Sequence, residues 1–352
     1  AFPAAAATVL AAGCSGAGAG GSGTAPVATQ RAPEEFVWQS VGPGRAGLDP
    51  VALRTIARDA RRAGSTCLLV VRDGRIAGEW YWRDGAADAA VAGFSVTKSV
   101  TSTLVGIAES EGHLDIDDRA SRYVRAWRGT PAAAVTVRDL LSNDSGRTWS
   151  RVTDYVGLIM AEDRTSYAVG LGQEKPPGSV WAYNNAAIQT LDEVLRRATG
   201  VPTADYAEER LFEPLGMTDT RMTGDASGRS TSTAFGLETT CRDLGRFGLL
   251  FSRGGAWEGA QVVPRSWVDE AVGRPSQRLN PDYGLLWWLN HDGSLVPGAP
   301  RDVFAAIGFG GQVLLVDPRS ETVVVRLGVP GEGDYDVRDA ARVVTEAVRR
   351  PR

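Results

Sequence analysis

Strand-like segments at the two ends of the chain enclose a long region of helix and loop. Near the start, residues 65–82 form two β-rich runs joined at Asp73-Gly74, a dipeptide typical of a β-hairpin. Near the end, residues 303–328 contain three further short β-rich runs. This order predicts an α+β fold in which one antiparallel sheet of five or more strands is assembled from both ends of the chain.

Helices are expected to flank that sheet. Residues 48–64 have Asp49 as N-cap and Pro50 at the first helical position, and residues 336–350 close the chain with a second amphipathic pattern. Helical patterns also occur at residues 97–111, 136–146, 184–200, 242–255 and 265–273.

We therefore expect one domain over residues 36–352 with two subdomains. The sheet subdomain takes residues 36–94 and about 216–352. A mainly helical subdomain is inserted at about 95–215.

The first 35 residues have a different composition. An apolar run ends in small residues and Cys14, and a Gly/Ser/Ala linker follows. This segment resembles the end of a bacterial lipoprotein signal, with Cys14 in the place of the lipid-modified residue. We expect an exported protein, secreted or held at the cell surface by a lipid anchor; the alternative is a low-complexity tail on a cytoplasmic protein.

Composition excludes several classes of function. The net charge of −4 and the scattered arginines give no basic surface for nucleic acid. The two histidines and three cysteines show no metal-ligand spacing, so we expect neither a metal nor a cofactor. No protein partner is indicated. Cys67 and Cys241 could pair, but spacing alone cannot establish a disulfide, and we interpret them as two buried free thiols.

The segment 93–103 (GFSVTKSVTST) is the strongest indication of chemistry. Of 38 lysines and arginines only two are lysines, Lys98 and Lys175, and Lys98 follows Ser95 by three residues at the start of a helix. Residues three apart lie on one helix face, so Lys98 can reach the Ser95 hydroxyl. A lysine can lose its proton when desolvated whereas an arginine does not, so this position suits a base that activates a serine nucleophile. The alternative is an N-cap serine with a solvated lysine.

Two more segments complete a pattern. Tyr183 and Asn185 form a Tyr-x-Asn before a helix, and residues 303–311 (VFAAIGFGG) form a strand of small residues. Together with Ser95-x-x-Lys98, they resemble the three motifs of the serine β-lactamase and penicillin-binding protein superfamily, in its class C-like branch. Phrases such as VRDLLSNDSG and RDLGRFGLLFSRGG are most similar to 6-aminohexanoate-dimer hydrolases and related carboxylesterases.

The resemblance implies a β-lactamase/transpeptidase-like fold and a role for each motif residue. Ser95 would be the acylated nucleophile, and Lys98 with Tyr183 would act as general base before Tyr183 protonates the leaving group. Asn185 would bind a substrate amide or hold Lys98. The backbone N–H groups of Ser95 and Phe309 would form the oxyanion hole, beside Gly308 in the substrate cleft.

The third motif departs from the β-lactamase pattern. Ala306-Ile307-Gly308 stands where Lys-Thr-Gly would provide a cation and a hydroxyl for an antibiotic carboxylate. We therefore expect an enzyme that hydrolyses a small amide, such as a 6-aminohexanoate oligomer, or a short-chain ester. The alternatives are a penicillin-binding or sensor protein that acylates with little turnover, a weak class C-like β-lactamase or D-amino-acid peptidase, and a catalytically silent scaffold.

The remaining residues carry weaker expectations. Tyr155 falls where the dimer hydrolases have a pocket tyrosine, although packing is an equal explanation. Three tryptophans could line the cleft, but we interpret all of them as core residues: Trp181, Trp287 and Trp288. We expect turn or surface positions for Asp144, Asp154 and His113, and a tight strand bend at Gly310 and Gly311.

Overall fold

The structure is a computed structural model, and it describes residues 36–349. The predicted signal-like segment at residues 1–35, with Cys14, lies outside the described residues. Within the described residues, no helix combines the length and apolar character needed to cross a membrane.

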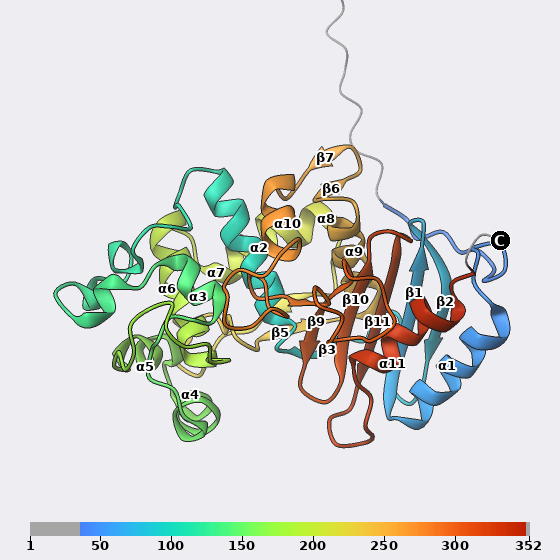
Figure 1. The fold of residues 1–352 in the computed structure, drawn as a ribbon, viewed down its shortest axis with the longest axis horizontal. Helices are drawn as coiled ribbons and strands as arrows, with labels where there is room; N and C mark the ends of the chain where they lie inside the picture. The colour runs from blue at the N-terminus through green and yellow to red at the C-terminus, as the bar shows by residue number, and fades with distance from the viewer. Residues whose placement is uncertain (1–35, 350–352) are drawn as a thin grey trace, which may run out of the picture. The chain divides into compact units, whose positions relative to one another are not determined.

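A six-stranded antiparallel sheet contains strands from both ends of the chain, as predicted (Figure 1). Its order is β2-β1-β11-β10-β9-β8. The hairpin at Asp73-Gly74 joins β1 to β2, and β1 then pairs along its length with β11 from the other end of the chain. The bounds are β1 Ser65–Arg72, β2 Arg75–Tyr81, β8 Trp288–Leu289, β9 Phe304–Gly308, β10 Gln312–Asp317 and β11 Thr322–Gly328.

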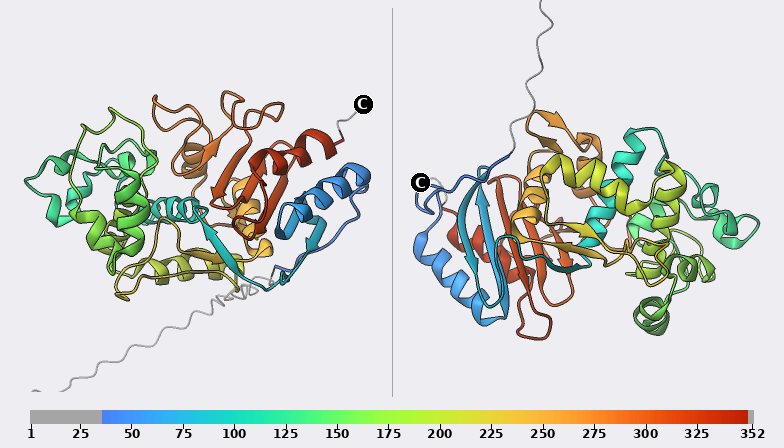
Figure 2. Two further views of the ribbon diagram at one scale, coloured as in Figure 1. Left: turned by 90° about the horizontal axis from the view of Figure 1, so that it is seen from below. Right: turned by 180° about the vertical axis from the view of Figure 1, so that it is seen from behind.

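Helices cover both faces of this sheet. The N-terminal helix α1 (Pro50–Arg62) and the C-terminal α11 (Val337–Arg342) lie side by side on one face (Figures 1 and 2). Helix α9 (Cys241–Ser252) packs against β1, β10 and β11 on the other face. Alternate residues of β1 therefore enter two different cores: Cys67, Leu69 and Val71 on the α9 side, and Leu68 and Val70 on the α1 side. Burial on both faces explains why this strand is a continuous apolar run.

Helices predominate between the two groups of sheet strands, where they gather on the β9 side of the sheet (Figures 1 and 2). Their bounds are α2 Thr97–Ser110, α3 Val137–Ser142, α4 Leu158–Met160, α5 Arg164–Gly170, α6 Asn185–Thr199, α7 Thr203–Ala207 and α8 Glu213–Leu215. Helix α10 (Arg265–Val272) follows later in the chain. The subdomain boundaries near residues 95 and 215 stay a prediction.

Two small sheets complete the fold. One joins β3 (Val91–Phe94), β5 (Leu237–Thr239) and β4 (Arg221–Met222), and the other pairs β6 (Ala256–Trp257) with β7 (Ala260–Gln261).

One helix is shorter than predicted. The pattern over residues 136–146 predicts a helix to Gly146, but α3 ends at Ser142 because Asn143 takes a left-handed conformation with φ 60°. Asparagine tolerates this conformation better than most residues and often ends helices in this way.

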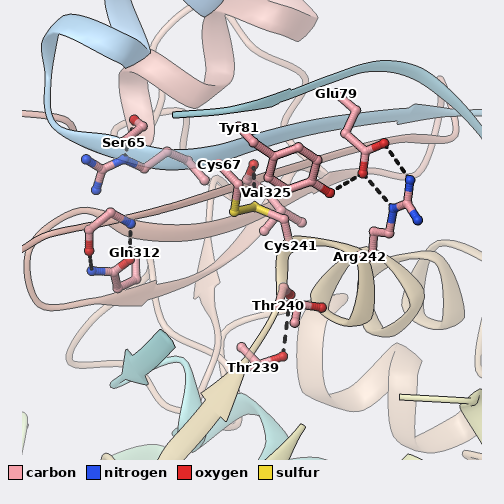
Figure 3. The surroundings of a disulfide bond; sticks show 12 residues. Ser65, Cys67, Glu79, Tyr81, Thr239, Thr240, Cys241, Arg242, Gln312 and Val325 are labelled. Carbon is pink, nitrogen blue, oxygen red and sulfur yellow. Dashed lines mark hydrogen bonds and ion pairs between the residues drawn. A yellow bond between two sulfur atoms is a disulfide. The ribbon is translucent and has the colours of Figure 1, made fainter. Parts of the chain in front are cut away.

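Cys67 and Cys241 form a disulfide, which corrects our interpretation of two free thiols (Figure 3). The bond joins β1 to the first residue of α9, and the two residues are 174 positions apart in the sequence. Beside it, Arg242 pairs with Glu79 through two hydrogen bonds of 2.7 and 2.9 Å. The pairing could not be predicted because it depends on how α9 lies on the sheet.

Candidate active site

Ser95 lies at a sharp turn from strand β3 into helix α2. Phe94, the residue before it, has a φ of 47°, a conformation that costs a non-glycine residue about 1–3 kcal/mol. Thr97 holds the turn in place: its hydroxyl donates to the Phe94 carbonyl and accepts from the Leu237 amide at 2.9 Å. The strained turn presents half-buried Ser95 at the start of α2.

Lys98 is the second residue of α2, one turn after Ser95, and its ammonium group is buried. Its side chain is 1% exposed, and Nζ donates to the Ser95 hydroxyl at 2.8 Å and to the Ala234 carbonyl at 2.7 Å. Burial lowers the pKa of Lys98 to about 7, although the negative charge of Asp154 opposes this shift. A large fraction of Lys98 is therefore neutral at physiological pH and can accept a proton from Ser95.

Tyr183 lies beside the same pair of residues. Its hydroxyl is close enough to Ser95 for that side chain to lower its pKa, and its ring centroid lies 4.9 Å from Lys98 Nζ. Burial raises the pKa of Tyr183 above its usual value of 10. The phenol thus stays protonated at neutral pH, which suits a proton donor or relay better than an independent base.

Asn185 begins helix α6 two residues after Tyr183, and its side chain contacts an unexpected partner. Its Nδ2 donates to Asp154 at 2.8 Å, and its backbone N–H donates to the same carboxylate at 2.9 Å. Asp154, for which we expected a turn or surface position, is only 1% exposed. The prediction of a solvated aspartate is wrong because this carboxylate caps a buried helix N-terminus.

The end of strand β9 lies against the turn that carries Ser95. A Cβ built on Gly308 would come within 2.3 Å of the Gly93 carbonyl oxygen, so only glycine fits at this approach. The rings of Phe309 and Phe94 make an edge-to-face contact with centroids 5.7 Å apart. Gly310 and Gly311 follow with φ of 76°, as the predicted bend requires. The chain segment that carries the Phe309 N–H is therefore packed against the turn that carries Ser95.

The comparison with known proteins identifies the family of this chain. Residues 53–347, most of the chain, match the Beta-lactamase family. The chain belongs to the beta-lactamase family.

Individual relatives in this family include amide and ester hydrolases. The chain is 26% identical over 313 residues to the 6-aminohexanoate-dimer hydrolase of Paenarthrobacter ureafaciens, covering 80% of this chain and 77% of that protein. The D-stereospecific amidohydrolase from Streptomyces sp. superposes with a TM-score of 0.64 at 20% identity, covering 84% of this chain and 98% of the other. A penicillin-binding protein homologue from Caulobacter crescentus gives a TM-score of 0.68 at 17% identity, covering 87% and 97%. The structural matches support the predicted β-lactamase/transpeptidase-like fold, and the chain is an enzyme of a serine hydrolase family.

Aromatic side chains surround Tyr183 in this beta-lactamase-family site. Its ring packs near those of Trp181, Tyr283 and Trp288. Trp181 and Trp288 are partly buried against the main core, whereas Trp287 is fully buried. The Tyr183 carbonyl accepts from the indole of Trp149 at 3.0 Å. Tyr155 is 50% exposed and lies close enough to Tyr183 to raise its pKa, so it borders the site.

Sequence reasoning missed three contributors to this site. The Ala234 carbonyl and the Trp149 indole contact Lys98 and Tyr183 through long-range folding and leave no local signal. Asp154 has a weak one, as a lone acid among apolar residues in TDYVGLIM.

The other expectations have mixed outcomes. Asp144 is also buried, contrary to a solvated position, and burial raises its pKa to about 7. His113 is partly exposed beside Glu111, as expected of a surface residue. Among residues 36–349, no group of three or more His, Cys, Asp or Glu side chains is arranged to hold a metal ion.

Proposed function

We propose that this protein is a serine hydrolase that forms an acyl-enzyme on Ser95 and cleaves an amide or ester bond of a small substrate. The observation that carries the proposal is the contact between Lys98 Nζ and Ser95 Oγ at 2.8 Å, in a buried setting that lowers the pKa of the lysine to about 7. A hydroxyl with an adjacent neutral amine is an activated nucleophile.

Acylation would use the two groups beside Ser95, Lys98 and Tyr183. Its Oγ attacks the substrate carbonyl carbon, while its proton passes to neutral Lys98. The bond to the leaving nitrogen or oxygen then breaks, and the leaving group takes the hydroxyl proton of Tyr183. Protonated Lys98 then gives its proton to Tyr183, which restores the tyrosine hydroxyl. In deacylation, water attacks the acyl carbon and gives a proton to the Lys98–Tyr183 pair. The bond between the acyl carbon and Ser95 Oγ then breaks, and Oγ takes a proton from the same pair, which restores the hydroxyl.

Backbone N–H groups would stabilise the oxyanion formed in both steps. We assign this role to the amides of Ser95 and Phe309, because the contacts of Gly308 and Phe309 hold the end of β9 against the Ser95 turn. A donor of this kind contributes roughly 3 kcal/mol of transition-state stabilisation.

The rim of the site favours substrates with an apolar part. Trp149, Tyr155 and Phe309 are exposed beside the catalytic residues. Ala306-Ile307-Gly308 provides neither cation nor hydroxyl on the strand that borders the site. We therefore propose small amides resembling 6-aminohexanoate oligomers, or short-chain esters, as substrates, and we place Asn185, Gly308 and Tyr155 in or beside their binding cleft.

The test is steady-state hydrolysis of p-nitrophenyl acetate followed by a substrate panel. The panel contains short-chain esters, 6-aminohexanoate dimer, D-amino-acid amides and nitrocefin. We expect continuous turnover of an ester or amide and loss of that activity in Ser95→Ala. An unchanged rate in Ser95→Ala would falsify the assignment. One stoichiometric burst without further turnover supports the sensor alternative, and nitrocefin as the best substrate supports the β-lactamase alternative.

The disulfide supports a proposal on localisation. Buried disulfides such as Cys67–Cys241 form and persist in oxidising compartments, so we propose an exported protein; attachment through Cys14 remains part of this proposal. Protein purified without reductant is expected to resist thiol alkylation at both cysteines until it is unfolded and reduced. If both cysteines are alkylated after unfolding without reduction, they are not joined by a disulfide in the native protein.

A further inference from the structure

In the π-helical turn η4 (Thr153–Gly157) beside the site, apolar side chains are exposed and an aspartate is buried, the reverse of the usual arrangement. Val152, just before the turn, is 68% exposed, and Tyr155 and Val156 within it are 50% and 55% exposed, whereas Asp154 is 1% exposed. Burying a carboxylate while leaving aliphatic side chains in water costs free energy unless the carboxylate has specific partners. Asp154 therefore calls for an explanation beyond packing.

Three donors converge on the Asp154 carboxylate. Oδ2 accepts from the backbone N–H and from Nδ2 of Asn185, and Oδ1 accepts from the Ala186 N–H at 2.8 Å. The two backbone groups are unpaired donors at the N-terminus of α6, where the helix dipole also favours a negative charge. Burial raises the pKa of Asp154, whereas these contacts and the charge of Lys98 favour its ionised form. They hold the carboxylate against Asn185, two residues after Tyr183.

We propose that Asp154 is a positioning residue of the catalytic site, which balances the charge of Lys98 and orients the Asn185 amide. This inference rests on the proposed function of Ser95 and Lys98. It adds a residue outside the three sequence motifs, on a segment that reaches the site only through folding.

The charges around Lys98 support the first part of the inference. Nζ faces the Ser95 hydroxyl, the Ala234 carbonyl and the ring of Tyr183, all of which are neutral at pH 7. Of the described charged groups, Asp154 is the one whose field acts appreciably on Lys98, and it raises the pKa of the lysine against the effect of burial. Tyr155 and Asp154 both act on Tyr183, whose pKa they raise.

The hydrogen-bond chemistry of a carboxylate supports the second part. An ionised carboxylate can only accept, so the Asn185 side chain must turn an N–H toward Asp154. This orientation leaves Asn185 Oδ1, an acceptor, for a substrate N–H or for the Lys98 ammonium. With its N–H held by Asp154, Asn185 is expected to act on the substrate or on Lys98 as a hydrogen-bond acceptor.

The experiment compares pH profiles of kcat/KM for p-nitrophenyl acetate in the full chain and in Asp154→Asn. Asparagine keeps the shape of the side chain and removes its charge. Because an opposite charge nearby favours protonated lysine, its loss is expected to move the acid limb of the profile to lower pH by about one unit. Asp154→Glu keeps the charge and is expected to hold the limb near the wild-type position.

Asp192→Asn is the matched control. Asp192 lies on α6, the helix whose N-terminus binds Asp154; it is 2% exposed and accepts from the hydroxyls of Thr165 and Thr203 at 2.7 Å. Its replacement is expected to lower the melting temperature without moving the limb. If Asp154→Asn does not fold, Asp154→Ser removes the charge and keeps an oxygen that can cap α6.

The outcomes separate this inference from the proposed function. A folded Asp154→Asn or Asp154→Ser variant with an unmoved limb overturns the role of Asp154, even when Ser95→Ala is inactive. Full activity in Ser95→Ala overturns the proposed function instead. A limb that moves equally in Asp192→Asn shows a general effect of lost buried acids and also overturns the inference.

Discussion

The identity of residue 98 follows from what a base must do in a buried site. A guanidinium group stays protonated in proteins, whereas an ammonium group loses its proton when burial outweighs its hydrogen bonds. At Lys98 two acceptors and the charge of Asp154 oppose the burial, and the pKa settles at about 7. Lysine at this position thus combines a reach to Ser95 with a proton affinity suited to neutral pH.

The pH dependence of the wild-type enzyme tests this balance. Neutral Lys98 is the active form, so kcat/KM for a neutral ester is expected to fall about tenfold per pH unit below an acid limb near pH 7. Because the pKa of Tyr183 is raised, the plateau above that limb is expected to extend to at least about pH 10. Rates in buffers of constant ionic strength measure both limits. A limb near pH 4–5, typical of a carboxylate base, would point to a base other than Lys98.

Replacement of Lys98 separates charge from proton transfer. Lys98→Arg keeps a cation but cannot accept a proton, so kcat/KM is expected to fall by about 10²–10⁴. Lys175→Arg changes the other lysine, outside the contacts on Ser95, and is expected to keep wild-type activity. Ester hydrolysis by the three purified proteins gives the comparison, and near-normal activity in Lys98→Arg contradicts the proposed base.

At the scale of elements, the site depends on the contact between the end of β9 and the Ser95 turn. Gly308→Ala is expected to push these segments apart, since its Cβ would lie 2.3 Å from the Gly93 carbonyl oxygen. Displacing the Phe309 N–H is expected to lower kcat by up to about 10²–10³, the effect of losing an oxyanion-hole donor. Gly170→Ala is the control, because a Cβ at Gly170 meets no atom within 4 Å. Equal kcat values for the two variants would contradict a role of β9 in positioning the Phe309 N–H.

Elements with strong local signals could be predicted from the sequence. The Asp49 cap, the Asp73-Gly74 turn and the β-rich runs on either side of that turn produce α1 and the β1–β2 hairpin as expected. Ser95 and Lys98 were found because a helix brings residues three apart together. The early end of α3 at Ser142 and the burial of Asp154 were missed, because a left-handed Asn143 ends the helix and a distant helix N-terminus binds the carboxylate.

At the scale of the whole molecule, the Cys67–Cys241 disulfide ties the first strand of the main sheet to a helix much later in the chain. A cross-link that closes so long a loop limits the unfolded chain and typically contributes about 2–5 kcal/mol of stability. The double variant Cys67→Ala/Cys241→Ala is therefore expected to melt several degrees lower than the oxidised protein. Thermal unfolding with and without reductant measures the effect, and an unchanged melting temperature in both comparisons contradicts a stabilising disulfide.

The central claim is that Ser95 carries the acyl group and that Lys98 takes its proton. Acid quenching during hydrolysis of p-nitrophenyl acetate, followed by peptide mass spectrometry, tests it most directly. We expect an acetyl group on Ser95 in the wild type, no adduct at this position in Ser95→Ala and strongly slowed acylation in Lys98→Arg. An acetyl group that maps to another residue during turnover, or wild-type acylation of Ser95 in Lys98→Arg, would contradict the account.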